Sequence, residues 1–201
     1  MSSCRLFWFG FLPVFFLSFL FSCLLVQAQP LLMGSESGNY DNGRSIAADK
    51  RNNVYVTGSF LSDTLILDSV ILKNHGGMDI FLIKYSPQGN VLWAKSIGGA
   101  GNDKGLALAL DHNDNVFLTG CFSDTFVFGD IPVGHQGQWD MFLSKLDTMG
   151  NCIWVKTGAG LGDDYGQGIA LDRDRNIYVA GFQQTNGFDL FLRKYDSSGT
   201  F

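Results

Sequence analysis

The sequence predicts an all-β fold built from a four-stranded unit that repeats about three times. Three segments are versions of one pattern: SIAADKRNNVYVTGSF from residue 45, LALALDHNDNVFLTGCF from 106 and GIALDRDRNIYVAGF from 168. A second pattern follows each of them: DIFLIKYSPQGNVLWAKSIGG from 79, DMFLSKLDTMGNCIWVKTGAG from 140 and DLFLRKYDSSGTF from 189. No stretch shows the 3.6-residue periodicity of an amphipathic helix.

The repeat period is close to 61 residues. Asp49, Asp111 and Asp172 are separated by 62 and 61 residues, and Trp93 and Trp154 by 61. Other residues recur in each unit: Gly58, Gly120 and Gly181, then Asp79, Asp140 and Asp189, then Lys84, Lys145 and Lys194. Such self-similarity indicates a repeat architecture in which each unit is one supersecondary element.

The expected strands are joined by short turns and are apolar on both faces. DKRNN, DHNDN and DRDRN join the first pair of strands, and SPQGN and DTMGN join the second. A sheet that is apolar on both faces must be covered on both. Sheets stacked face to face around an axis meet this demand, which predicts a β-propeller of four-stranded antiparallel blades. A repetitive β-sandwich and a parallel β-helix are the competitors, but sandwiches rarely repeat in sequence and β-helix coils are much shorter.

The connection between the two hairpins of a unit varies. It spans 21 residues from Gly58 to Asp79 and 20 from Gly120 to Asp140, but only 8 from Gly181 to Asp189. Such length changes alter the free energy of folding little, because the entropy of loop closure depends weakly on loop length. The inserts DTLILDSVILKN and DTFVFGDIPVG are apolar enough to form an extra hairpin on one rim.

The units resemble the bacterial SBBP repeat, named for a seven-bladed β-propeller. The matching patterns are Asp-x-x-Asn-Val/Ile-Tyr/Phe-Val/Leu-x-Gly, Asp-x-Phe-Leu-x-Lys and Gly-Asn-x-x-Trp-x-Lys, which cover nearly everything after Gly34. The resemblance implies a propeller fold and secretion or surface display. It implies no defined activity.

The blade units are expected at about 43–98, 105–158 and 166–201, with the last one truncated. Residues 31–42 are a candidate ring-closing strand and inter-blade turn. Propellers close with about four to eight blades. We therefore expect an incomplete propeller, as a fragment of a longer protein.

Residues 1–28 are expected to be a signal peptide. Arg5 precedes an apolar run from Leu6 to Val26, and cleavage is expected after Ala28, leaving a secreted or cell-surface propeller over 29–201 with no membrane span. Two alternatives stay open, namely an uncleaved membrane anchor and a lipid-modified Cys23.

The net charge bears on which partners are expected, and the two cysteines after the leader bear on whether a disulfide is expected. Without the leader the chain keeps 13 of its 14 basic residues and all 19 acidic ones, which argues against nucleic acid or an anionic membrane. Cys121 and Cys152 are expected at opposite ends of a sheet, too far apart for a disulfide.

Three sets of residues are weighed as cation sites. The turns that begin at Asp111 and Asp172 resemble the start of a calcium loop, but Val116 and Ile177 stand where that loop needs glycine. Side-chain to backbone bonds within the turn are the favoured interpretation. Asp41, Asp103 and Asp164 recur between units and are weak metal candidates, with a carboxylate that accepts backbone N–H groups as the alternative. No cofactor is expected.

Other polar and aromatic residues have a structural interpretation beside a functional one. His75, His135 and Gln184 occupy equivalent loops, and the two histidines are candidates for a metal or an acid–base pair or are solvated loop residues. The recurring lysines should lie along the blade and pair at the rim. Trp139 could stack on a sugar, while Trp93 and Trp154 should pack between strands.

We therefore expect a non-catalytic, secreted or cell-surface scaffold that binds a protein or glycan at the propeller rim. The alternative is the propeller part of an extracellular hydrolase or lyase, whose carboxylates could come from distant strands.

Overall fold

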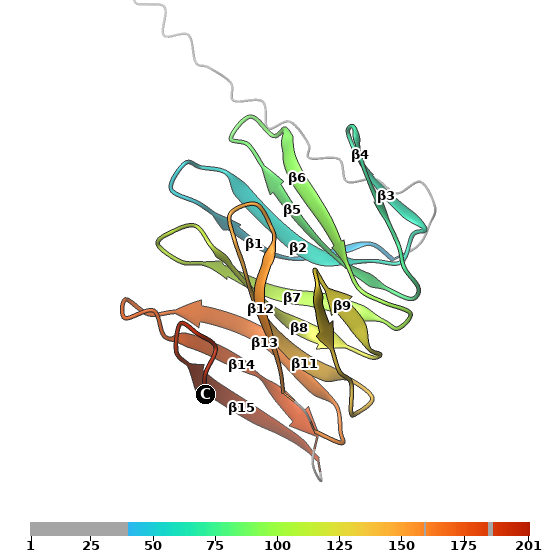
Figure 1. The fold of residues 1–201 in the computed structure, drawn as a ribbon, viewed down its shortest axis with the longest axis vertical. Helices are drawn as coiled ribbons and strands as arrows, with labels where there is room; N and C mark the ends of the chain where they lie inside the picture. The colour runs from blue at the N-terminus through green and yellow to red at the C-terminus, as the bar shows by residue number, and fades with distance from the viewer. Residues whose placement is uncertain (1–39, 159, 185–186) are drawn as a thin grey trace, which may run out of the picture. The chain divides into compact units, whose positions relative to one another are not determined.

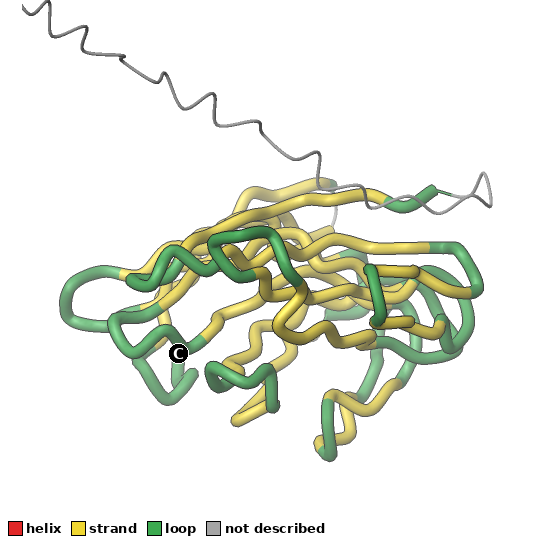
Figure 2. Tube along the Cα trace, turned by 90° about the horizontal axis from the view of Figure 1, so that it is seen from above, coloured by secondary structure: helices red, strands yellow, loops and turns green. Residues whose placement is uncertain are grey.

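The computed structural model describes residues 40–158, 160–184 and 187–201. The expected signal peptide at 1–28 and most of the expected ring-closing segment at 31–42 lie outside these residues. Every regular element in the described part is a β-strand (Figure 2), so the predicted all-β class is confirmed. Within that part, no helix exists that could cross a membrane.

Three antiparallel sheets follow one another in chain order, and we call them blades 1 to 3 (Figure 1). Blade 1 has the strand order β1 (Asn42–Ala48), β2 (Val54–Phe60), β5 (Asp79–Tyr85), β6 (Val91–Ile97). Blade 2 has the order β7 (Asp103–Leu110), β8 (Val116–Phe122), β11 (Asp140–Leu146), β12 (Cys152–Gly158). Blade 3 contains β13 (Asp164–Leu171), β14 (Ile177–Gln184) and β15 (Phe188–Tyr195). The sheets are open, as expected of an incomplete propeller.

Alternation along the strands sends apolar side chains to both faces of each sheet, and the neighbouring blade covers them. Ile80 and Leu82 of β5 share one core cluster with Leu118 and Phe142 of blade 2. The neighbours of Phe142 on β11, Met141 and Leu143, point to the other face and belong to a second cluster with blade 3. The first strand of each following blade contacts the blade before it: β7 lies against β1, β2 and β5, and β13 lies against β7, β8 and β11.

The two long inserts form the extra hairpins that the sequence predicts. β3 (Thr64–Leu67) pairs with β4 (Val70–Lys73), and β9 (Phe126–Phe128) pairs with β10 (Ile131–Val133). The first hairpin buries Leu65, Leu67 and Leu72 against one face of blade 1. The second buries Phe126 and Phe128 in the cluster between blades 1 and 2. Each hairpin therefore fills the outer part of a blade face.

The recurring glycine near the end of the second strand permits a close approach of the innermost strand. A Cβ at Gly58, Gly120 or Gly181 would stand 1.9, 1.8 or 1.8 Å from the carbonyl oxygen of Asn42, Lys104 or Tyr165. Register shifts in β1, β7 and β13 occur beside these glycines. Only glycine leaves room for this bulge, which explains its recurrence in the sequence.

Candidate functional site

The blades present two rims. The hairpin rim carries the β3–β4 and β9–β10 hairpins and the starts of β5, β7, β11 and β13, whereas the turn rim carries the short turns after β1, β7 and β13. The residues singled out in the sequence as candidate ligands divide between these two rims.

On the turn rim, an aspartate and an asparagine close each turn internally. Asp111 Oδ1 accepts the backbone N–H groups of Asn113 and Asn115 at 2.8 and 2.9 Å, and its Oδ2 accepts the Asn115 amide at 2.9 Å. Asp49 and Asp172 make equivalent bonds. Although burial acts to raise it, these bonds hold the pKa of Asp111 below its ordinary value. Both carboxylate oxygens of Asp111, which a calcium loop would use first, are therefore engaged in the turn.

Two of the recurring lysines, Lys84 and Lys145, lie beside these aspartates. Lys84 Nζ is 3.5 Å from Asp49 Oδ2 and Lys145 Nζ is 3.8 Å from Asp111 Oδ2. Their ammonium groups also lie over the rings of Tyr55 and Phe117, at 4.7 and 5.1 Å from the centroids. Lys194 lies over Tyr178 at 5.6 Å. The lysines thus fasten the third strand of a blade to its first turn.

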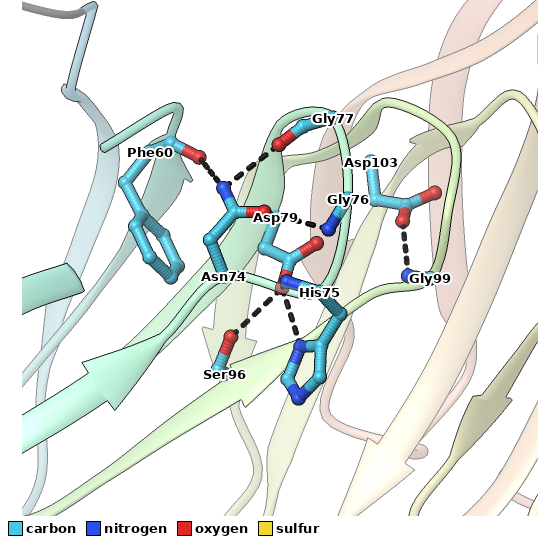
Figure 3. A network of polar contacts seen from close by, with 9 residues as sticks. All are labelled: Phe60, Asn74, His75, Gly76, Gly77, Asp79, Ser96, Gly99 and Asp103. Carbon is cyan, nitrogen blue, oxygen red and sulfur yellow. Dashed lines mark hydrogen bonds and ion pairs between the residues drawn. The ribbon is translucent and has the colours of Figure 1, made fainter. Parts of the chain in front are cut away.

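On the hairpin rim, a buried carboxylate ties together the loop before β5 (Figure 3). Asp79 is fully buried, and its Oδ2 accepts the backbone N–H of His75 at 2.9 Å and the Ser96 hydroxyl at 3.1 Å. The His75 ring, half exposed, places Nδ1 2.6 Å from the same oxygen. Asn74 completes the loop by donating to the carbonyl oxygens of Phe60 and Gly77.

A second buried carboxylate, Asp103, approaches Asp79 at the start of the next blade (Figure 3). Its Oδ2 accepts the Gly99 backbone N–H at 2.8 Å. A Cβ on Gly98 would stand 2.3 Å from Asp79 Oδ1 and 2.8 Å from Asp103 Oδ2, so the two carboxylates flank this glycine. Oδ1 of each aspartate is buried without a partner among the described residues.

Two carboxylates so placed favour a bound proton. Burial, with a smaller contribution from the Asp79 charge, raises the pKa of Asp103 to about 7. A protonated Asp103 can donate to an acceptor, whereas an ionised one adds a second buried negative charge. Asp103 can therefore bind or release a proton near neutral pH.

Blade 2 repeats this arrangement in part. Asp140 Oδ2 accepts the backbone N–H groups of Gln136 and Gly137 at 2.6 and 3.3 Å, and His135 Nε2 is 4.0 Å away. Burial raises the pKa of Asp164, the counterpart of Asp103. His75 and His135 thus each meet the aspartate of their own blade, and nothing in these contacts joins the two histidines.

The third residue of the candidate metal set behaves differently. Asp41 accepts the backbone N–H of Leu61 and the hydroxyl of Ser62, at 3.1 and 2.8 Å. Across the described residues, no group of three or more His, Cys, Asp or Glu side chains is arranged to hold a metal ion. The carboxylate near Asp103 is that of Asp79, a proximity that sequence spacing did not reveal, because these residues come from different blades.

The tryptophans and cysteines are the last of the residues that the sequence singled out. Trp93 and Trp154 pack edge-on against Tyr55 and Phe117. Trp139 stacks on Tyr165 at 5.7 Å, with the Lys104 ammonium 4.3 Å from its centroid. Cys121 and Cys152 are free thiols.

The family model for the SBBP beta-propeller repeat matches residues 34–59 and 156–188. Both matches include a blade's first strand and the aspartate-closed turn that follows it. The predicted resemblance to this repeat is therefore confirmed.

Two curated proteins are similar at the sequence level. An uncharacterized WD repeat-containing protein of Acanthamoeba polyphaga mimivirus is 27% identical over 153 residues, which are 68% of this chain and 11% of that protein. Regulatory protein FlaEY of Caulobacter vibrioides is 27% identical over 139 residues, 62% of this chain and 15% of that protein. The chain therefore spans a small part of the length of these relatives.

Among solved structures, a protein of unknown function from Bacteroides caccae aligns with a TM-score of 0.41 and 12% identity. The alignment covers 82% of this chain and 48% of that protein.

Proposed function

We propose that this chain, whose repeats are SBBP beta-propeller repeats, is a non-catalytic scaffold of the cell exterior that binds a protein or glycan at its hairpin rim. Repeat proteins present binding surfaces on loops that a constant frame holds in place. The frame is visible here in the recurring glycines, lysines and aspartate-closed turns.

The observation that carries the proposal is the contrast between the two rims. On the turn rim, Asp49, Asp111 and Asp172 close three turns in the same way. On the hairpin rim, blades 1 and 2 carry hairpins, whereas in blade 3 Gln184 pairs directly with Phe188. Variation confined to one rim is typical of a surface that differs with its ligand.

Three finer parts of the proposal rest on other support. The leader pattern at 1–28 supports export. The small share of each curated relative that the chain spans supports a piece of a longer protein. The resemblance to the bacterial repeat supports a bacterial source.

Site-specific photocrosslinking tests the assignment of the binding rim. A photoreactive phenylalanine analogue is placed in the full chain at Ile66 or Val127, which are exposed on the two hairpins, or at Met149, which is exposed on a turn of the opposite rim. After irradiation on the producing cells, we expect crosslinked species from Ile66 and Val127 and none from Met149. Crosslinks from Met149 alone would move the binding surface to the turn rim.

Two further measurements address export and catalysis. The N-terminal residue of the protein recovered outside the cell should be Gln29 if the leader is cleaved as predicted. The same protein should leave chromogenic glycoside, ester and uronate substrates unchanged. Turnover that disappears on His75→Ala would instead support the hydrolase or lyase alternative, because His75 contacts the buried Asp79.

A further inference from the structure

A cavity of about 590 Å³ opens on the hairpin rim where blades 2 and 3 meet. We call this meeting place of the two blades the second junction. Ligand sites in proteins typically enclose about 300–1,000 Å³. The residues that line it are Gln138, Gly160, Leu161, Gly162, Asp163, Asp164, Gln183, Gln184 and Arg193.

The first junction, between blades 1 and 2, shows what occupies this place elsewhere. There the β9–β10 hairpin forms a bridge from Phe126 to Gly99, and a Cβ on Gly99 would stand 2.8 Å from the Phe126 Cβ. Gly160 is the repeat counterpart of Gly99. The three atoms nearest to a Cβ on Gly160 all belong to Asp164, so among the described residues no hairpin residue stands in the position of Phe126. Within the described residues, the cavity therefore lies where the β9–β10 hairpin stands in the first junction.

The walls of the second junction differ from those of the first at the positions that support the hairpin there. Phe122 supports the hairpin in the first junction, with its ring 5.3 Å from that of Phe126. Its counterpart in blade 3 is Gln183, whose Oε1 accepts a hydrogen bond from Arg193 Nη2 at 2.9 Å. Ile97, buried beside the hairpin, has Gly158 as its counterpart. The apolar residues that support the hairpin in the first junction are therefore replaced in the second junction by residues that form hydrogen bonds or carry no side chain.

This wall offers donors and acceptors in close succession. Carboxylates accept, a guanidinium donates, and the glutamine amides do both. Oδ1 of Asp163 is buried and has no partner among the described residues, so it calls for a donor from a ligand or water. Two carboxylates face one guanidinium, which disfavours an anionic ligand. Hydroxyl groups suit this surface because each one donates and accepts.

We propose that the cavity of the second junction, built around Asp163, Gln183 and Arg193, binds a neutral saccharide. The ligand takes the place that the β9–β10 hairpin fills in the first junction, and Leu161, 92% exposed at the edge of the cavity, offers an apolar contact to a sugar ring. Trp139, the sugar-stacking candidate of the sequence, is engaged by Tyr165 and Lys104 instead. This inference rests on the proposed function, since it specifies a ligand for the hairpin rim.

The test is saturation-transfer and amide-shift NMR on the full chain as expressed. The probes are cellobiose, xylobiose, mannobiose, galactobiose and N,N′-diacetylchitobiose at millimolar concentration, with spermidine as a cationic probe. We expect at least one disaccharide to shift the side-chain amide signals of Gln183 and Gln184. Asp163→Asn and Gln183→Ala should each weaken its binding about tenfold, as expected for the loss of one or two hydrogen bonds. Gln136→Ala, an exposed glutamine on the same rim, should bind as the unmodified chain does.

The remaining outcomes are distinct. If Gln183→Ala does not fold, Gln184→Ala replaces it, since Gln184 lines the same cavity. Binding by none of the disaccharides, binding by spermidine alone, or unchanged sugar affinity in the cavity variants overturns the saccharide site. Sugar binding that moves other hairpin-rim signals overturns the cavity but leaves the rim scaffold in place. Cleavage of a bound probe, followed by chromatography, overturns the non-catalytic function and leaves the cavity as the binding site.

Discussion

The indole Nε1 of Trp93 donates a hydrogen bond to the carbonyl oxygen of Thr148 at 3.1 Å, which joins the outer strand of blade 1 to a turn of blade 2. The next turn residue but one, Gly150, has φ of 77°, and a Cβ there would stand 3.0 Å from the Trp93 ring. Trp154 and Gly199 repeat this contact. The recurring Trp and Gly are therefore two halves of one contact between blades.

Trp93→Phe should lower the free energy of unfolding by about 1–3 kcal/mol, because it removes the bond to Thr148 and leaves a void beside Gly150. Urea unfolding followed by far-UV circular dichroism measures the change. Met149→Ala is the control, since Met149 is exposed on the same turn and should shift the midpoint little. Equal effects of the two substitutions would mean that Trp93 does not join the blades.

Gly120→Ala should destabilise the chain by more than about 3 kcal/mol, since the added Cβ would stand 1.8 Å from the Lys104 carbonyl oxygen and force β7 away from β8. Gly134→Ala is the matched control, because nothing lies within 4 Å of its Cβ position. Thermal melts of the two variants should differ clearly. A Gly120→Ala variant as stable as Gly134→Ala would show that the bulge accommodates a side chain.

Much of this architecture follows from local sequence. Strand pairs, the turns at Asp49 and Asp111 and the extra hairpins are encoded by residues close together in the chain, so their pattern could be read directly. The proximity of Asp79 to Asp103 could not be predicted, because it depends on how two blades meet. The cavity beside Gln183 was also not predicted from the sequence. A signal existed, because the unit with the short connection has glutamine in the place of Phe60 and Phe122. A lost loop and a changed wall residue, taken together, would have located it.

Asp103→Asn should stabilise the chain increasingly as the pH rises. The pKa of Asp103 is raised from 3.8 to about 7 on folding, so the stability held by its proton is present below about pH 4 and is lost as the pH rises through 7. A shift of this size corresponds to about 4 kcal/mol as an upper estimate. Asparagine never ionises and can offer its amide to Asp79, so its advantage should grow from pH 4 to 7 and then level off.

Urea unfolding of both proteins from pH 4.5 to 8.5 measures this difference. Comparing the two proteins cancels the shared carboxylates that do not interact with Asp103, whereas the charges of Asp79 and Asp124 act on Asp103 and are part of the measured difference. Asp130→Asn, at an exposed turn aspartate, is the control and should leave the pH dependence of the unmodified chain in place. A pH-independent difference between Asp103→Asn and the unmodified chain would contradict a raised pKa of Asp103 at this junction.

Asp111→Ala should cost about 1–2 kcal/mol of stability, equally in EDTA and in millimolar Ca²⁺, because its oxygens are bonded to Asn113 and Asn115. Differential scanning fluorimetry in both buffers measures this. Asp130→Ala, an exposed turn aspartate, is the control. A melting temperature that rises with Ca²⁺ in the unmodified chain and not in Asp111→Ala would show instead that this turn binds calcium.

Leu192→Ser should leave the unfolding free energy nearly unchanged while reducing self-association. Leu192 is 70% exposed on the outer face of blade 3, whereas its repeat counterparts Leu82 and Leu143 are fully buried beneath the next blade. The same face carries Leu190, which is 85% exposed, so the surface has the composition of a blade interface.

Light scattering across a concentration series should show association in the unmodified chain and less in Leu192→Ser. Leu143→Ser, the buried counterpart, should instead lower stability by about 3 kcal/mol or more. If Leu192→Ser destabilises the chain as strongly as Leu143→Ser, the outer face of blade 3 must already be covered within the chain. In that case it is not a surface built to receive another blade.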